Sequence, residues 1–267
     1  MGRTGTLSKP SPHRVYIQAL AVLSVYIRIS FGGRLEIPAY IPEERFWSPI
    51  RRSLPLRSKT RVWKEEVYFP TEVALEGELT SRVPEGCLAY WPPERALCLF
   101  AWASQPYGPV VRLGWLLGPK QNVFEVEEDE EVVVDEPRRG DYPERLWSLA
   151  DLLRAQGFLA VPRSWEGFQS VVGAAVRPDI RVGFEIFVED FGFIVESDPL
   201  YLRDFSPVDE SFRRSLQRAR VFRSRLDVSE DGYVVLSEYA RSESELVSAV
   251  HTVVQDFARA IDILQLR

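Results

Sequence analysis

Two adjacent acids beside aromatic residues make the chemically most suggestive stretch of the chain. Glu65 and Glu66 lie between Trp63 and Tyr68 in the phrase RVWKEEVYF. On a strand, alternation places Glu66 and Tyr68 on one face and Trp63 on the other. A buried carboxylate needs a partner. Glu66 is therefore interpreted either as a ligand-orienting acid at a pocket or as half of a structural ion pair with an arginine.

Aromatic side chains cluster around two adjacent prolines in EGCLAYWPPERALCLFAW, residues 85–102. A mouth rich in Trp, Tyr and Pro suits proline-containing or aromatic ligands. The same residues equally suit core and rim packing at a strand end, where prolines preset a turn. Both interpretations stay open. The candidate ligand-binding residues are Trp63, Glu66, Tyr68, Tyr90, Trp91, Phe100, Trp102 and Tyr107.

Other site chemistries find little support in the sequence. His13 and His251 are far apart, which argues against a histidine dyad or a histidine-rich metal site. Cys87 and Cys98 form no disulfide framework or zinc motif; two buried thiols and a cross-strand pair both fit them. The chain contains no phosphate loop and no nucleophile elbow. We expect no cofactor and no metal.

Composition excludes further classes. A net charge of −6 over 267 residues argues against a nucleic-acid binder, which needs a basic surface. The apolar stretch VYIQALAVLSVYI is too short to cross a bilayer, and no small-residue cleavage site follows it. We expect a cytoplasmic protein without membrane contact. Of the 33 basic residues 29 are Arg, and Met1 is the only Met; a thermophilic source and GC-rich coding both explain this composition.

The candidate site residues lie in the first of two halves of the chain, and the sequence predicts a different fold class for each half. Residues 1–14 are predicted to be a disordered tail, and residues 15–122 to be short strands with one short helix at 42–55. Residues 123–141 are so acidic and so rich in Pro and Gly that they predict a solvated linker, with one short edge strand as the alternative for residues 132–134. Residues 142–267 predict an α+β domain with helices on an antiparallel sheet.

The order of blocks in the first half resembles a cyclophilin-like family of small bacterial and archaeal proteins of unassigned function, over about residues 22–119. That family carries Trp-Gly-x-Glu-Ile-Tyr-Phe, then Gly-Asp, two hydrophobic residues and Tyr-Trp-Pro-Pro-Gly, then a strand ending in Phe-Phe-Gly, then Ile-Gly. The resemblance implies a closed β-barrel of about eight strands with a short helix. The matching residues are Trp63, Glu66, Tyr68, Phe69, Gly86, Tyr90, Trp91, Pro92, Pro93, Phe100 and Gly114.

This chain departs from the family pattern at four positions. Lys64 and Glu94 each replace a glycine, and Cys87 replaces an acid. Trp102 replaces the glycine of Phe-Phe-Gly, where a small residue lets a backbone or ligand approach closely. An indole at that position is expected to fill the space, which puts a family pocket at this rim in doubt.

The second half resembles, by its order of elements, the YbjN-type and type III secretion chaperone-like fold. This resemblance implies a protein-binding module, or a homodimer formed through a helix face. Together the two halves predict a non-catalytic protein in which a cyclophilin-like barrel binds a peptide or small molecule and the second half binds a protein. An enzyme, a peptidyl-prolyl isomerase or foldase, is the alternative, with Arg61 as candidate donor to the prolyl nitrogen. A purely structural subunit is a third hypothesis.

Overall fold

The computed structural model describes residues 25–178, 180–219 and 221–264. The predicted tail at residues 1–14, including His13, and the first part of the strand expected after it lie outside the described residues.

The first half is built from short strands whose side chains alternate between two faces. In β1, for example, Ile27, Ile29 and Phe31 are buried and the residues between them are partly exposed. One short helix, α2 (Glu44–Arg52), buries Phe46, Trp47 and Ile50, and two short 3₁₀ helices, η1 (Pro92–Glu94) and η2 (Lys120–Glu125), follow later in the chain. The strands are β1 (Val25–Phe31), β2 (Leu35–Glu36), β3 (Ala39–Ile41), β4 (Leu56–Lys59), β5 (Arg61–Trp63), β6 (Glu66–Pro70), β7 (Leu79–Thr80), β8 (Cys87–Trp91), β9 (Ala96–Phe100), β10 (Val110–Leu116) and β11 (Glu131–Asp135).

The sheet of this half curls but does not close. Antiparallel ladders give the order β4-β11-β1-β3-β10-β8-β9-β6-β5, with β7 beside β10. Within the described residues no ladder joins β4 to β5 or β6. A side-chain hydrogen bond bridges this seam, donated by Ser58 Oγ to the Pro70 carbonyl at 2.7 Å. The predicted closed barrel is therefore wrong, because the two end strands do not pair.

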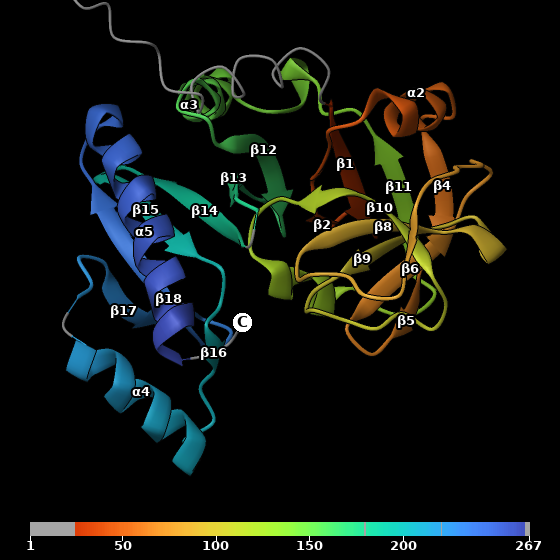
Figure 1. The fold of residues 1–267 in the computed structure, drawn as a ribbon. Coiled ribbons are helices and arrows are strands. Elements are labelled where there is room, and N and C mark those ends of the chain that lie inside the picture. The colour runs from red at the N-terminus through yellow and green to blue at the C-terminus, as the bar shows by residue number, and fades with distance from the viewer. Residues whose placement is uncertain (1–24, 179, 220, 265–267) are drawn as a thin grey trace, which may run out of the picture.

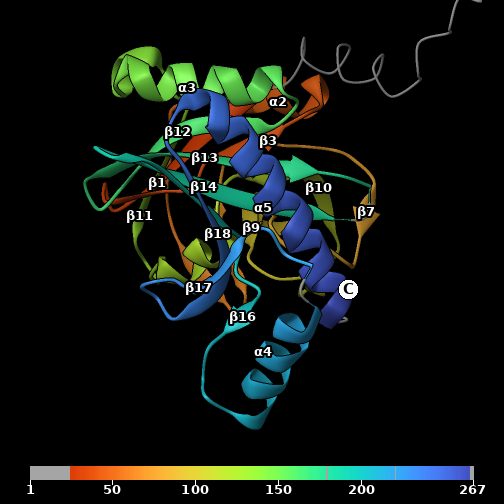
Figure 2. The same ribbon diagram turned by 90° about the vertical axis from the view of Figure 1, so that its left-hand side faces the viewer.

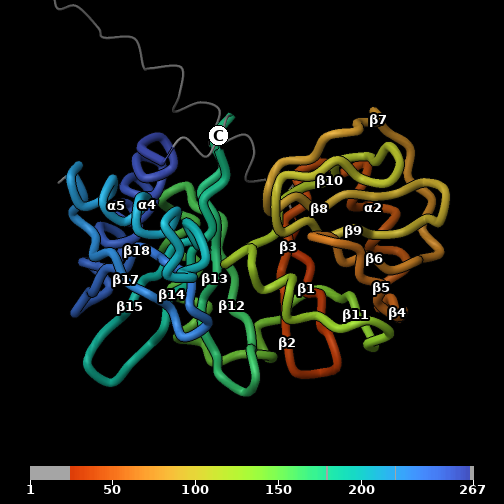
Figure 3. Tube along the Cα trace, turned by 90° about the horizontal axis from the view of Figure 1, so that it is seen from below, coloured from red at the N-terminus to blue at the C-terminus, as the bar shows by residue number. Residues whose placement is uncertain are grey.

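The strands of the second half continue the same sheet. The short strand β2 pairs with β1 on one side and, through Leu35 and Trp165, with β12 on the other. All 18 strands thereby form one open antiparallel network. We call the part that contains β1–β11 the first lobe and the part that contains β12–β18 the second lobe. Figure 3 shows the two lobes side by side with β2 and β12 at their junction. A separate α+β domain with its own sheet is not observed, so that prediction is also wrong. The additional strands are β12 (Leu159–Trp165), β13 (Phe168–Val176), β14 (Arg181–Glu189), β15 (Gly192–Ser197), β16 (Tyr201–Leu202), β17 (Arg225–Val228) and β18 (Tyr233–Ala240).

Helices are few and lie mainly beside the second lobe (Figure 1). The long helix α5 (Glu243–Leu264) runs diagonally across β14, β15 and β18, and α3 (Glu144–Ala155) packs on β12 and β13 (Figure 2). The helix α4 (Pro207–Ala219) contacts α5, and a 3₁₀ turn, η3 (Arg139–Asp141), precedes α3. Among the described residues, no helix combines the length and the apolar character needed to span a membrane.

The acidic range expected to be a linker contains a strand in the middle of the sheet. Strand β11 pairs with β1 on one side and with β4 on the other, so it is not the edge strand considered from the sequence. Its Val132 and Val134 are buried, while Glu131 is exposed and pairs with Arg57. This segment is therefore part of the structured sheet. The division into domains at residues 122 and 142 stays a prediction.

Two buried ion pairs lie where the lobes meet. The Arg181 and Asp198 side chains are fully buried and pair at 2.8 Å, and Arg181 Nε also donates to the Leu116 carbonyl at 2.9 Å. The buried Arg163 pairs with Glu185 and reaches across to Asn122 Oδ1 at 3.4 Å. In both cases an arginine pairs with an acid of its own, second lobe and donates further hydrogen bonds to groups of the first.

Candidate ligand pocket

The candidate site lies on the outer face of the curled sheet. Along β6, the side chains of Val67 and Phe69 join the main core of the first lobe, whereas Glu66 and Tyr68 lie on the opposite face. Strands β8 and β9 alternate in the same way and contribute a second, smaller cluster on that outer face. The expectation that Glu66 and Tyr68 share a face is confirmed, but this face is not the interior of a barrel.

Small side chains at the centre of this face leave room above it. Tyr68 on β6 lies opposite Cys98 on β9, which lies opposite Ala89 on β8. Ala96 lies opposite Trp91 at the end of the same two strands. Alternation therefore surrounds a floor of alanine and cysteine with larger aromatic residues.

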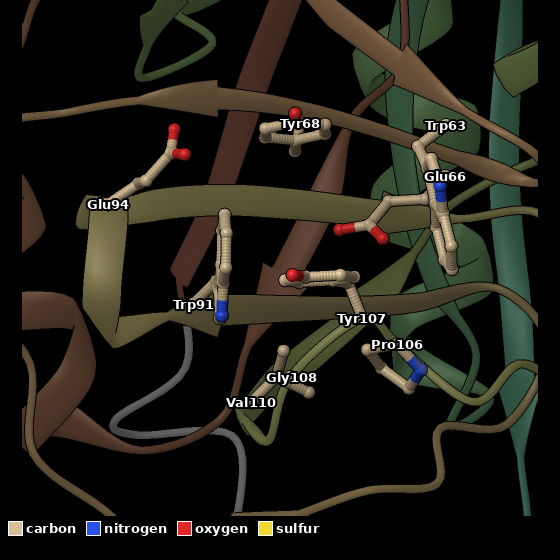
Figure 4. Close-up of a pocket in the computed structure, with 9 residues that line it drawn as sticks. All are labelled: Trp63, Glu66, Tyr68, Trp91, Glu94, Pro106, Tyr107, Gly108 and Val110. Carbon is tan, nitrogen blue, oxygen red and sulfur yellow. The ribbon is translucent and has the colours of Figure 1, made fainter.

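Four aromatic rings enclose a cavity of about 320 Å³ above this floor. Tyr68 meets Trp91 with ring centroids 6.1 Å apart at 86°, and Trp91 meets Tyr107 at 6.2 Å and 86°. Trp63 meets Tyr107 at 6.5 Å and 81°. In such edge-to-face pairs the rings act as walls at right angles, not as a stack, as Figure 4 shows. Glu66, Glu94, Pro106, Gly108 and Val110 complete the lining.

The loop between β9 and β10 supplies the lip of the pocket. Tyr107 is 83% exposed and is held mainly by its ring contacts with Trp63 and Trp91. Gly108 lies so close to the Trp91 indole that a Cβ atom there would be 3.0 Å from Nε1. The Trp91 Nε1–H is buried and has no hydrogen-bond partner among the described residues. Trp91 therefore contributes ring surface and no hydrogen bond.

The carboxylate of Glu66 points into the cavity, between the rings of Trp91, Tyr68 and Tyr107 (Figure 4). Glu66 is only 7% exposed, and no Arg or Lys in the described part of the chain forms an ion pair with it. Burial raises the pKa of Glu66, the Cys98 thiol lowers that pKa as a hydrogen-bond partner, and the charge of Glu65 raises it. The structural ion pair considered from the sequence is thus not observed. An acid without a basic partner is the main polar feature of the site.

The second acid of the lining is neutralised within the protein. Glu94 follows the two prolines in η1 and accepts a hydrogen bond from Arg61 Nη1 at 2.6 Å. The Arg61 guanidinium also lies over the Tyr68 ring, 5.9 Å from its centroid. Arg61 is therefore at the rim of the pocket, in contact with two lining residues.

The hairpin of β5 and β6 places Trp63 beside Glu66. These two residues pair directly across the hairpin, so both belong to the pocket face although alternation along one continuous strand would separate them. Lys64, in the turn, has φ 56°. Left-handed backbone of this kind favours glycine, which explains why the resembled family has glycine at this position.

Five of the eight predicted ligand-binding residues line this one cavity, and three do not. Tyr90 points into the main core, where its hydroxyl donates to the Val73 carbonyl at 2.9 Å. Phe100 is fully buried in the outer-face cluster beneath the pocket. Trp102 packs against Phe124, below the Lys120 ammonium, and does not fill the pocket as expected from its replacement of a glycine.

Little in the sequence indicates the other lining residues. Glu94 stands out there only as a departure from the family pattern, Pro106 and Gly108 reach the site through the fold of the β9–β10 loop, and Val110 begins β10. Cys87 and Cys98 are both buried and free, so the cross-strand disulfide is not formed. Within the described ranges, no three His, Cys, Asp or Glu side chains are grouped to hold a metal ion.

Comparison with known proteins supports the resemblance of the first half. Residues 25–135 match a family model described as Cyclophilin-like, and this range includes β11. A hypothetical protein from Archaeoglobus fulgidus, known from its solution structure, is similar at 28% identity over 43% of this chain and 96% of that one, with a TM-score of 0.36. No curated protein matches. The resemblance predicted for residues 142–267 gains no support and stays a prediction.

Proposed function

We propose that this chain is a non-catalytic binding protein whose site is the aromatic pocket on the outer face of β6, β8 and β9. The ligand is a small molecule, or a side chain of a peptide, that enters between the four rings. The observation that carries this proposal is the cavity of about 320 Å³ lined by Trp63, Tyr68, Trp91 and Tyr107 around an unpaired Glu66 carboxylate.

Three features of the pocket support binding over simple packing. An aromatic ring in a core buries both faces, whereas Tyr107 is 83% exposed and Trp63 and Trp91 are only partly buried. Pockets that bind small ligands are mostly apolar with a few convergent polar groups, and this one has that composition. A structural role also gives no reason to keep the Glu66 carboxylate unpaired and facing the cavity.

The proposal can be tested by NMR, because the seven Trp residues give a small set of indole N–H signals. A mixed set of small amines, alcohols and proline-containing or aromatic peptides is titrated into the protein. We expect a binder to shift the signals of Trp63 and Trp91, assigned with Trp→Phe variants, and to leave Trp147 in α3 unmoved. Shifts at Trp147 but not at Trp63 or Trp91, or no shift with any compound, contradict the proposed site.

A prolyl isomerase is the alternative, since Arg61, the candidate donor to a prolyl nitrogen, lies at the rim of the aromatic pocket. Its guanidinium is engaged by Glu94 at 2.6 Å, so donation to a prolyl nitrogen requires that this ion pair open or share its donors. A proline-peptide isomerisation assay separates the two hypotheses. Activity that is lost in Arg61→Ala supports the enzyme, and activity that survives this change rules out Arg61 as the donor.

For the second half we propose a protein partner or a second copy of this chain. Large apolar side chains are exposed around the start of α4, with Phe205 78% and Val208 61% exposed. Exposed apolar surface of this kind supports an interaction role when several such residues lie together. Light scattering of the full chain, compared with Phe205→Ser, tests the homodimer: a dimer that the substitution dissociates supports it, and a monomer at high concentration contradicts it.

A further inference from the structure

The walls of the aromatic pocket are suited to a positive charge. Aromatic rings carry negative potential on their faces, and cations bind over them within about 6 Å of the centroid. Tyr68, Trp91 and Tyr107 meet in edge-to-face pairs and not in stacks, and the cavity lies between them (Figure 4). Trp63 closes the side next to Glu66 (Figure 4).

The charge inside the pocket also favours a cation. Of the two lining acids, Glu94 is neutralised by Arg61, whereas Glu66 has no basic partner in the part of the chain that the structure describes. Above its pKa Glu66 is a carboxylate, and a neutral ligand that fills the cavity removes its remaining water without compensation, so Glu66 must first take up a proton. A cationic ligand supplies that compensation.

We infer that the ligand of this pocket carries an alkylated ammonium group, held by the faces of the four rings and by the Glu66 carboxylate. This inference rests on the proposed function, because it names the ligand class of that same site. An alkylated ammonium presents methyl groups to the rings and spreads its charge over them. A guanidinium or primary ammonium has several N–H donors to satisfy, and the pocket offers one unpaired carboxylate.

The protein itself places a cation on one of these rings. The Lys64 ammonium lies over the Trp63 ring, 4.4 Å from its centroid, although Lys64 does not line the pocket. The Trp63 indole is thus in a setting that accommodates positive charge.

A matched pair of ligands tests the inference. Choline and 3,3-dimethylbutan-1-ol have the same shape and differ in the charge of the central atom. We expect choline to shift the Trp63 and Trp91 indole signals and to bind at least about tenfold more tightly than the alcohol. Acetylated trimethyllysine amide is titrated in parallel, and its affinity relative to choline distinguishes a peptide-borne group from a free small molecule.

A matched pair of variants isolates the carboxylate. Glu66→Gln keeps the shape of the side chain and removes its charge, so we expect it to abolish the preference for choline over the alcohol. Glu65→Gln makes the same change of net charge at a residue of the turn that does not line the pocket, and we expect it to keep the preference. Both variants are first shown by their thermal unfolding to be folded.

The pH dependence gives a second readout. The titratable or charged groups around Glu66 are Cys98 on β9, whose pKa is raised by burial, Glu65 in the turn, the Glu94–Arg61 pair, and the hydroxyls of Tyr68 and Tyr107. The pKa of Glu66 is raised, so its carboxylate ionises at higher pH than an ordinary glutamate. Choline affinity is therefore expected to rise with pH through that ionisation in wild type and to stay flat in Glu66→Gln.

The possible outcomes separate this inference from the proposed function. If the alcohol binds as tightly as choline, or if Glu66→Gln keeps the preference, the ligand class is wrong while the pocket remains a binding site. If neither ligand, nor any other compound of the mixed set, shifts the Trp63 and Trp91 signals, the binding proposal fails and the inference with it.

Discussion

Two neighbouring aromatic residues of β8 lie on opposite faces of the sheet, one in the core and the other in the pocket. Tyr90 is 2% exposed, lies in the main core and donates its hydroxyl to the Val73 carbonyl. Trp91, the next residue, points to the opposite face and lines the pocket, and its indole N–H has no hydrogen-bond partner in the described part of the chain. The two aromatic side chains therefore have separate tasks although the sequence presents them as one pair.

We predict that Tyr90→Phe destabilises the protein and leaves ligand binding intact. Loss of the buried hydroxyl leaves the Val73 carbonyl without this donor and costs about 0.5–1.5 kcal/mol of the free energy of unfolding. Trp91→Phe is the matched change on the other face, and we expect it to weaken ligand binding several-fold because it reduces ring area only. Denaturant unfolding and NMR titration of both variants check this; a Tyr90→Phe protein that loses binding contradicts the separation of faces.

This separation also shows what could be predicted for single residues. Trp63, Glu66, Tyr68, Trp91 and Tyr107 were predicted as ligand-binding residues by type, and they do line one cavity. Tyr90 is of the same type, but alternation along a strand already turns it away from Trp91. Trp63 is the opposite case, because its place opposite Glu66 depends on a hairpin register that its position in the sequence does not reveal.

At the scale of elements, acids brought together by neighbouring strands make the sheet sensitive to pH. Glu196 on β15 lies directly opposite Glu185 on β14, and β17 and its turn bring Asp227 and Asp231 near it. Burial, followed by these like charges, raises the pKa of Glu196 to about 7. The folded protein therefore holds a proton on Glu196 that the unfolded chain releases near pH 4.5.

We predict that Glu196→Gln stabilises the protein at pH 8 and not at pH 4. A raised pKa contributes stability that is complete below about 4.5 and is lost as pH rises through about 7. The gain at pH 8 is of the order of 1 kcal/mol after solvent screening, or about 2–4 °C in Tm for a protein of this size. Thermal unfolding between pH 4 and pH 8 measures it, with the exposed Glu189→Gln as the charge-matched control; equal slopes for all three proteins contradict the prediction.

The type of most elements could be predicted, but one charged segment could not. Alternation correctly indicated short strands in the first half. In β11, the block of acids outweighed the alternation of Val132 and Val134, which was the better guide. Arg57 pairs with Glu131, and Arg28 pairs with Asp135, so the charges that suggested a solvated linker are neutralised by neighbouring strands. Such partners are distant in sequence and cannot be found from composition.

At the scale of the whole molecule, the fully buried pair of Arg181 and Asp198 joins the two lobes. Arg181 also packs over Gly86, where a Cβ atom would come within 2.6 Å of the arginine side chain. Asp198 accepts the backbone N–H of Lys120 at 3.0 Å. Residues 86, 116 and 120 of the first lobe are thereby joined to residues 181 and 198 of the second.

We predict that Arg181→Met lowers the free energy of unfolding by about 3–5 kcal/mol, because it leaves the Asp198 charge buried and unpaired. Arg57→Met, which breaks an exposed pair, is the control and is expected to cost less than about 1 kcal/mol. Denaturant unfolding, followed by fluorescence and circular dichroism, measures both. If Arg181→Met is too unstable to purify, Asp198→Asn in the same background is expected to recover part of the loss; two separate transitions in wild type contradict the joint role of the pair.

The overall architecture was the least predictable level. The order of blocks identified the resemblance of the first half, whose match extends over residues 25–135. Whether a curled sheet closes depends on the pairing of β4 with β5 or β6, and whether two halves share one sheet depends on the two-residue strand β2. Short strands at such positions leave almost no pattern in the sequence.

The position of the pocket outside the curled sheet has an evolutionary consequence. Its lining comes from the outer face of β5, β6, β8 and β10, from η1 and from the β9–β10 loop, while the opposite face of β6, β8 and β10 holds the core. Substitutions in the lining can therefore change ligand preference without repacking the interior, and the β9–β10 loop can vary in length at little cost to folding. Proteins that share this fold are free to diverge in what they bind, so a ligand found for one of them is a poor guide to the others.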